Sequence, residues 1–293
     1  MKSRARLTGL SVDVDSIQSH LRGYGITDCS DRQSHYQRAI PRILEMFAKF
    51  EATATFFLIA DEAKDFPDTI KGIISAGHEI GCHSMTHGLP FDLRDQARRH
   101  LEIHEAKKLL EDISGAPVIG FRAPSWDTTA ELREALNQAG FMYDASSFPS
   151  WMMFLYRRQV ERHAQLTTQT ATPFSWSQCV ALPYPHKISA TGLIEIPVTT
   201  TPVFRLPYYH TLSYLLPRPI FSAVRAMAHL RRGPLVYTFH AADFLGLKED
   251  TLDERFSRHP GMTQSLTYRL SRCGEELSHF SRAVPLRAIA KLV

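Results

Sequence analysis

Four short stretches of this 293-residue chain carry side chains that could perform hydrolytic chemistry. The first is the segment GHEIGCHSMTH, in which His83 and His87 lie four residues apart with a polar turn between them. Two imidazoles at this spacing are compatible with a metal site, but they are also compatible with two neighbouring surface histidines. The pair therefore needs a third ligand from elsewhere in the chain before it predicts a metal centre.

Asp13 and Asp15, in the segment LSVDVDS, are candidates for that third ligand. Residues two apart in a β-strand point to the same face, and carboxylates gathered there are costly unless they are solvated, paired or bound to a metal. Because the carboxyl ends of parallel strands form one reactive rim, we expect these carboxylates to converge with His83 and His87. Two imidazoles and one carboxylate, with a position left open for water, are the ligand set of a catalytic zinc site.

Two further predicted strand ends carry reactive groups. The segment GFRAPSW places Arg122 and Trp126 after one strand, and YTFHAAD places His240 and Asp243 after another. Taken alone, Arg122 could be a surface cation and His240 a histidine of the core. Four such features at four strand ends are better explained together, as parts of one site.

Strand-like and helix-like segments alternate along the whole chain. Strands are expected at residues 7–15, 52–60, 79–84, 117–124, 141–146, 193–199 and 234–244, and helices at 39–50, 66–78, 92–115, 128–140, 212–233 and 262–282. This alternation predicts an α/β fold with about seven parallel strands, in a sheet that is open or closed into a barrel.

The chain shows no linker or internal repeat that would divide it, so we expect a single domain over residues 1–293. The alternation is interrupted by an irregular insertion at about 149–190, and inserts of this length are usually functional. The C-terminal helix is expected at about 262–282.

Taken in order, the segments SVDVD, HSMTH, GFRAPSW and TFHAAD resemble the polysaccharide deacetylase family, the NodB-homology domain of carbohydrate esterase family 4. The resemblance extends over roughly residues 7–244. It implies a distorted (β/α) barrel, a divalent metal that is usually zinc, and hydrolysis of N-acyl groups on amino sugars. The metal ligands that it implies are Asp15, His83 and His87.

The resemblance also implies roles for the other matching side chains. Asp13 would be the general base, Arg122 would orient it, and His240 would be the general acid. Such a set matches the chemistry, because amide hydrolysis needs a polarised carbonyl, an activated water and a proton for the departing amine. The residues implied at the oxyanion and the substrate are Ser125, Trp126 and Trp151.

The chain departs from the family pattern in two places. Val14 separates two aspartates that are usually adjacent, a spacing similar to that of lipid-linked formamido-arabinose deformylases and intracellular deacetylases. Ser150 precedes Trp151 where the family usually carries an Asp–Trp pair. The carboxylate that would tune His240 is therefore left open between Asp243 and Asp144.

The net charge of +4 conceals a basic middle section. Residues 145–242 hold nine basic and two acidic side chains, which favours an anionic partner or a solvated basic face. Two parts of this section, from Trp151 to Arg158 and from Tyr208 to Arg232, have the composition of peripheral membrane anchors. Core-facing helices with a basic outer side would have the same composition. A nucleic-acid partner is not expected, because no recognition motif or stacking groove is present.

The predicted location is the cytoplasm, on the inner face of the membrane if the anchors act. The N-terminal residues lack a secretory pattern, no run of about 20 apolar residues occurs, and the four cysteines form no CxxC pair. The expected substrate is an amino sugar, acetylated or formylated, on a polyprenyl phosphate or another glycan precursor. Alternatives are an allantoinase-like amidohydrolase and a non-catalytic binding module, although such a module would be expected to have lost Asp13 or His240.

Overall fold

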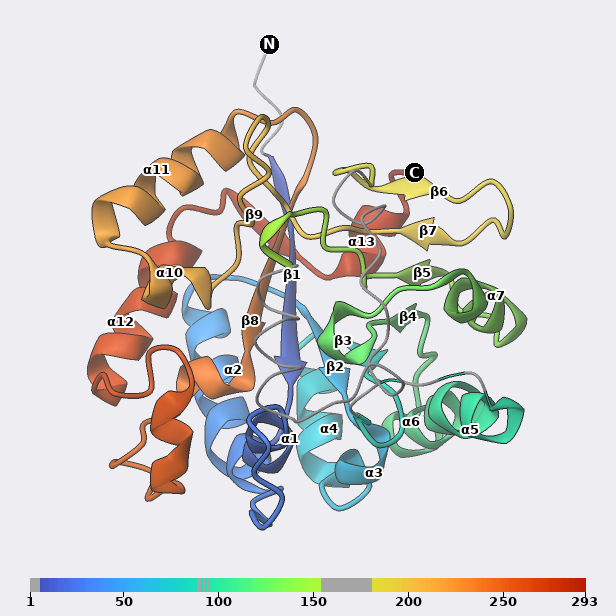
Figure 1. The fold of residues 1–293 in the computed structure, drawn as a ribbon, viewed down its shortest axis with the longest axis horizontal. Coiled ribbons are helices and arrows are strands. Elements are labelled where there is room, and N and C mark those ends of the chain that lie inside the picture. The colour runs from blue at the N-terminus through green and yellow to red at the C-terminus, as the bar shows by residue number, and fades with distance from the viewer. Residues whose placement is uncertain (1–5, 89–90, 92, 94, 154–180) are drawn as a thin grey trace.

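The computed structural model describes the chain except for residues 1–5, 89–90, 92, 94 and 154–180. Its strands form one sheet in the order β6-β7-β5-β4-β3-β2-β1-β8, with β9 paired to β1. Figure 1 shows β1 at the centre of the molecule, with helices arranged around the sheet. The strands are β1 (Leu7–Val14), β2 (Thr55–Leu58), β3 (Glu79–Cys82), β4 (Gly120–Phe121), β5 (Tyr143–Asp144), β6 (His186–Lys187), β7 (Ile194–Glu195), β8 (Leu235–His240) and β9 (Arg282–Val284).

The strands expected from the sequence are present as β1 to β5, β7 and β8, and all of them pair in parallel. The predicted α/β fold is therefore confirmed. The sequence did not predict β6, which is antiparallel to β7, or β9, which is parallel to β1. Strands of two or three residues are too short to carry a periodic pattern.

The two ends of the parallel series approach each other without forming a ladder. The Thr199 N–H donates to the Val236 carbonyl at 3.1 Å, and the Val236 N–H donates to Thr199 Oγ1 at 2.7 Å. The His210 N–H donates to the Thr238 carbonyl at 3.1 Å. The segment after β7 thus lies against β8, and the sheet curls into the expected distorted barrel.

The helices match the expected pattern with two corrections. The helix predicted over 212–233 is two helices, because Pro217 follows the extended Leu216 and starts a new helix. The helix predicted over 92–115 begins at Gln96 and contains a π-helical turn, η2. The helices are α1 (Ile17–Arg22), η1 (His35–Ala39), α2 (Ile40–Lys49), α3 (Ala60–Ala63), α4 (Pro67–Ser75), α5 (Gln96–His100), η2 (Leu101–Glu105), α6 (Ala106–Ser114), η3 (Pro124–Trp126), α7 (Ala130–Gln138), α10 (Leu212–Leu215), α11 (Arg218–His229), η4 (Ala241–Phe244), η5 (Glu254–Arg258), α12 (Leu266–Leu277) and α13 (Leu286–Ala290).

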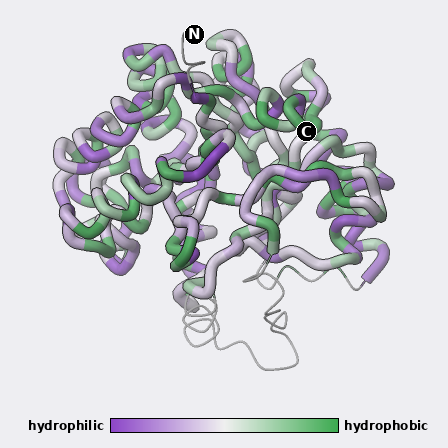
Figure 2. Tube along the Cα trace, turned by 90° about the horizontal axis from the view of Figure 1, so that it is seen from above, coloured by the Kyte–Doolittle hydropathy of each residue, from purple (hydrophilic) through white to green (hydrophobic). Residues whose placement is uncertain are grey.

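Side chains along β1 point alternately into the large apolar core and into the interior of the barrel. Leu10, Val12 and Val14 pack into the large apolar cluster that includes residues of the outer helices. Those helices alternate between hydrophobic and hydrophilic residues along their length (Figure 2), as expected for helices with one buried face. Asp13 lies in register with Phe57, which belongs to the second apolar cluster, and therefore faces the inside of the barrel.

The insertion predicted at 149–190 is only partly described. Arg157 and Arg158, and with them most of the first predicted membrane anchor, lie outside the described residues. In the second predicted anchor, Tyr208 is buried and α11 turns Phe221, Val224 and Ala228 into the core, so α11 is a core-facing helix. Among the described residues, no helix has the length and apolar character needed to cross a membrane.

Candidate active site

The register of the parallel strands brings the site residues to one end of the barrel. Asp13 of β1 lies beside His240 of β8, so both side chains point inward. Asp15 follows the end of β1, and His83 follows the end of β3. These residues line one pocket of about 380 Å³, together with His87, Ser125 and Trp126. The structure thus brings together residues from all four motifs of the sequence.

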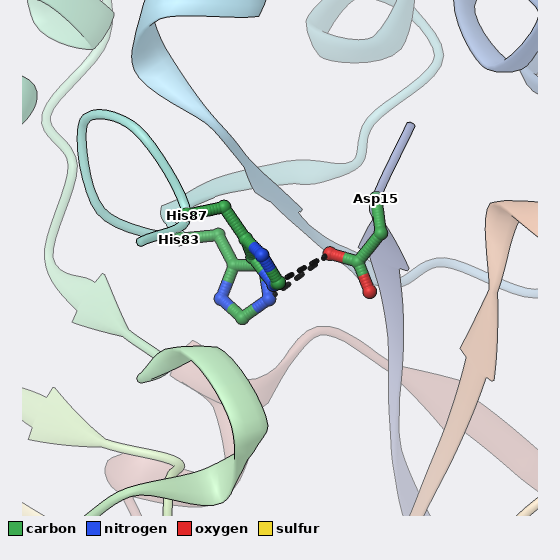
Figure 3. Close-up of side chains that lie close together, drawn as sticks. All are labelled: Asp15, His83 and His87. Atoms are coloured by element: carbon green, nitrogen blue, oxygen red, sulfur yellow. Dashed lines mark ion pairs between the residues drawn. The ribbon is translucent and has the colours of Figure 1, made fainter. Parts of the chain in front are cut away.

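Asp15, His83 and His87 converge on one point (Figure 3). His83 Nε2 lies 3.1 Å and His87 Nε2 3.4 Å from the same oxygen, Asp15 Oδ1. One ligand atom from each residue lies within 4.8 Å of the other two, and all three residues are buried. This is the donor set of a catalytic site for a divalent ion such as zinc.

The bonds around the three ligands support metal binding. The nitrogen His83 Nδ1 lies 2.6 Å from the Arg122 carbonyl, which can only accept, so Nδ1 carries the proton and Nε2 presents its lone pair to Asp15. Asp15 Oδ1 is buried and has no hydrogen-bond donor among the described residues. Because a buried carboxylate oxygen without a partner is costly, this atom is better explained as a ligand than as part of the core.

The turn between the two histidines is held in a strained shape. Ser84 and His87 have φ angles of 67° and 52°, which are uncommon for residues other than glycine. Ser84 Oγ accepts the His87 N–H at 3.1 Å, as expected for a residue that caps this turn. The Glu102 carboxylate accepts the N–H groups of Met85 and Thr86, both at 3.0 Å, and so anchors the turn to η2.

Asp13 is held by a fully buried arginine. Arg122 Nη1 donates to Asp13 Oδ1 at 2.5 Å and to Ser11 Oγ at 3.0 Å. The guanidinium carbon lies 4.3 Å from the Phe57 ring centroid and 4.5 Å from that of Trp126, so the group is sandwiched between two aromatic rings. This arrangement leaves Asp13 Oδ2 directed toward the pocket.

Gly81 of β3 makes room for part of this sandwich. A Cβ atom at position 81 would lie 2.5 Å from the Phe57 ring, so only glycine lets Phe57 reach Arg122. The glycine in EIGC thus has a role in the site that its position in a strand did not reveal.

Charge and burial act in opposite directions on the ligands. Burial alone would raise the pKa of Asp15, but the imidazoles of His87 and His83 hold it well below the usual value. Burial lowers the pKa of His87, whereas the Asp15 carboxylate outweighs burial and raises the pKa of His83. His20, which also lines the pocket, has a pKa lowered to about 3 by burial and is therefore neutral.

His240 lies on β8, on the other side of β1 from β3 in the strand order. Its Nε2 is 3.8 Å from Asp13 Oδ2, and its Nδ1 is 3.4 Å from Thr211 Oγ1. Asp243 accepts the backbone N–H of His240, and the charge of His240 opposes the rise that burial causes in the pKa of Asp243. Asp144 accepts from Ser146. That one of these carboxylates tunes His240 stays a prediction, and Asp243 is the one in contact with it.

Ser125 and Trp126 line the pocket as expected, with left-handed φ angles of 54° and 58°. Two consecutive strained residues at a pocket wall are typical of functional sites. Trp151 does not line this pocket, and its contact with the substrate stays a prediction. Its side chain is half-exposed, and its indole N–H donates to the Phe204 carbonyl at 2.9 Å.

Several residues of the site could not be identified from the sequence. Thr211, His259, Arg258 and Glu102 lie in no motif, and only the fold brings them near the predicted residues. Apolar side chains from separate segments complete the pocket, namely Phe148, Met152, Met153, Tyr209 and Leu215. The sequence feature that these apolar residues share is their position in the middle section of the chain, where the periodic pattern of strands and helices is lost.

Comparison with known proteins supports the resemblance. Residues 29–143 match the sequence model of the polysaccharide deacetylase family. This segment contains His83, His87 and Arg122, whereas Asp15 and His240 lie outside it. A peptidoglycan deacetylase of Helicobacter pylori is 31% identical over 144 residues, which are 48% of this chain and 49% of that protein. The chain thus spans about half the length of this curated relative.

Solved structures agree on the fold. A protein of Mycobacterium smegmatis assigned as a polysaccharide deacetylase aligns over 100% of this chain and 92% of its own, with a TM-score of 0.61 and 19% identity. The allantoinase Puue aligns over 99% and 91%, with a TM-score of 0.59 and 16% identity. At these identities the likeness concerns the fold alone, and the formamido-arabinose subgroup stays a prediction. Residues 29–143 match the polysaccharide deacetylase family, in agreement with the resemblance carried by HSMTH and GFRAPSW, whereas SVDVD and TFHAAD lie outside the matched residues.

Proposed function

We propose that the protein is a metal-dependent hydrolase that removes an N-acyl group from an amino sugar. The observation that carries the proposal is the convergence of Asp15, His83 and His87 beside the Arg122–Asp13 pair and His240 in one pocket. A divalent ion held by the three ligands, most plausibly zinc, would act as a Lewis acid on the amide carbonyl and on a water molecule.

Asp13 would act as the proton acceptor in this reaction. Its Oδ1 is occupied by Arg122, so its Oδ2 remains to take a proton from the attacking water. The buried guanidinium fixes the orientation of the carboxylate before the proton is transferred. Arg122 therefore contributes by positioning the base.

His240 would donate the proton that the departing amine requires. Its Nε2 lies in the same pocket as the ligands, 3.8 Å from Asp13 Oδ2. An acceptor and a donor on two sides of the same carbonyl would separate the two proton transfers of amide hydrolysis. Ser125, on the pocket wall, would lie near the oxyanion.

The substrate proposed is an acetylated or formylated amino sugar carried by a polyprenyl phosphate, handled at the inner face of the cytoplasmic membrane. Support comes from apolar side chains near the pocket. Leu215 lines the pocket and is 56% exposed, and Phe204 is 64% exposed beside the half-exposed Trp151. Exposed aromatic and aliphatic groups in a basic section suit an anionic lipid surface.

The catalytic proposal is tested by measuring the metal content of the purified protein and its release of acetate or formate. The substrates would be acetamido and formamido sugars, each with and without a lipid tail, and allantoin would serve as the competing substrate. We expect about one ion per chain and release from at least one N-acyl sugar. Hydrolysis of allantoin alone, or a fully active metal-free protein, would overturn the proposal.

The lipid proposal is tested by vesicle sedimentation of a Trp151→Ser, Phe204→Ser variant. We expect the variant to lose binding to phosphatidylglycerol vesicles but to cleave a short soluble substrate as the wild type does. Leu101→Ser, an exposed leucine on η2, is the control that should stay bound. Unchanged binding of the double variant would end the lipid proposal.

A further inference from the structure

The two ring nitrogens of His240 have different neighbours. Nε2 faces Asp13 Oδ2 at 3.8 Å, and Nδ1 faces Thr211 Oγ1 at 3.4 Å. The His240 side chain also accepts the backbone N–H of Asp243 at the start of η4. A hydroxyl can donate to Nδ1 or accept from it, so Thr211 can hold the ring with Nε2 facing the pocket in either protonation state.

The segment that carries Thr211 is held in place from both sides. Next to it, the His210 N–H bonds to β8, and the His210 ring lies 3.1 Å from the Tyr237 hydroxyl and 3.0 Å from the Tyr214 hydroxyl. Cys273 Sγ of α12 lies 3.4 Å from the same ring. Thr211 is thus anchored to the strand that ends at His240 and to α12.

Arg269 of α12 reaches both segments that flank His240. The side chain is fully buried, and its Nη2 donates to the carbonyl of Ala242 in η4 at 2.6 Å. Its guanidinium carbon lies 5.0 Å from the ring centroid of Tyr214, three residues after Thr211. A buried arginine with a bond to one segment and an aromatic contact to the other limits the movement of both.

We propose that Thr211 and Arg269 are positioning residues for His240, and that the Thr211 hydroxyl orients its imidazole. The inference rests on the proposed function. When Nε2 gives its proton to the departing amine, the ring loses one proton, and the Thr211 hydroxyl, which can accept from Nδ1 or donate to it, stays paired with the ring. No further charge or co-reactant is needed. Thr211 therefore holds the same ring orientation before and after the transfer.

The first test compares Thr211→Val with Thr211→Ser on the best N-acyl sugar. Because a well-placed general acid contributes about 10²–10⁴-fold, we expect Thr211→Val to lower kcat by about 10-fold or more with KM unchanged. Thr211→Ser keeps the hydroxyl and should restore most of the rate. Thr263→Val, at an exposed threonine, is the control that should match wild type. A valine variant with the wild-type kcat would overturn the inference.

The second test compares two buried arginines of α12. Arg269→Lys keeps the charge but loses the reach to both segments, so kcat should fall with KM unchanged. Arg272→Lys is the matched control, because Arg272 is equally buried but bonds to Glu275 of its own helix. Equal losses of kcat in the two variants would mean that Arg269 acts only through stability.

A third measurement needs no turnover. Nitrogen NMR of histidine-labelled wild-type protein, with the His240 signal identified by its loss in His240→Gln, reports which ring nitrogen carries the proton. We expect the Nδ1 signal of His240 to differ between the wild type and Thr211→Val and to agree between the wild type and Thr211→Ser. The same Nδ1 signal in the wild type and in Thr211→Val would overturn the inference even if deacylation is observed. If no N-acyl sugar is cleaved but the Nδ1 signal shifts in Thr211→Val, the proposed function fails and the Thr211 contact stands.

Discussion

The metal side and the acid side of the pocket are built in different ways. On the metal side, Asp15, His83 and His87 come from two short motifs at strand ends, and His83 is held by the Arg122 carbonyl at the end of the adjacent strand β4. On the acid side, His240 depends on Thr211 and on Arg269, which lie outside the strands of the sheet. The difference suggests that the ligands are placed by the strand ends, whereas the orientation of the acid is set by the packing of α12.

The largest expected effect separates the ligands from the base. His83→Ala should lose both metal and turnover, because it removes one of three ligands. Asp13→Asn should keep the metal and lower kcat by about 10²–10⁴-fold, since a neutral amide cannot take the proton. Metal analysis and kinetics on the same preparations test both, and His100→Ala, at an exposed histidine, is the control. Near-normal turnover in Asp13→Asn would show that Asp13 is not the general base.

The sequence predicted the metal side well for a physical reason. Period-2 alternation and the common rim of parallel strands were enough to bring Asp13, Asp15 and His83 together. On the acid side, the sequence predicted His240 but not the residues that hold it. Thr211 follows no periodic pattern. Arg269 lies in a helix whose sequence shows an amphipathic face but does not show which segments that face will contact. Those contacts depend on how the helix packs against the barrel, and the spacing of residues in the sequence does not encode this packing.

The fold shows the same division. Strands with several alternating residues were found at their predicted places, whereas β6 and β9 were missed because two or three residues carry no period. The carboxylate that tunes His240 could not be chosen from the sequence for a related reason. Distance in the chain did not reveal that η4 turns Asp243 onto the His240 backbone N–H, or that Asp144 bonds to Ser146.

The next prediction tests whether Asp144 belongs to the acid side at all. Burial raises its pKa to about 6, whereas the unfolded chain has the ordinary value near 3.8. Below pH 3.8 the carboxyl is protonated in both states. As the pH rises from 3.8 to 6, only the unfolded state releases its proton, so the folded state loses about 3 kcal/mol relative to its acid limit.

Asp144→Asn should remove this loss. The variant is expected to be more stable than wild type at pH 8, by up to about 3 kcal/mol, and to match it near pH 4. Urea denaturation at the two pH values measures the difference, with Asp68→Asn as an exposed control. Because Asp144 bonds to Ser146 and not to His240, kcat should stay at the wild-type level. A large fall in kcat would indicate that Asp144 supports His240 after all.

The smallest expected effect concerns the turn that holds His87. Glu102 accepts the Met85 and Thr86 N–H groups and the Thr86 hydroxyl, and so supports the left-handed residues on either side of them. Glu102→Gln removes the charge but keeps the shape, and it should weaken metal binding by about 10- to 100-fold, as observed for groups that orient ligands. Competition with a chelator measures this, and Glu105→Gln, on the exposed side of η2, is the control. Full metal affinity in Glu102→Gln would contradict this prediction. It would mean that Ser84 and the end of β3 hold the turn without Glu102, so that the strand end alone places His83 and His87.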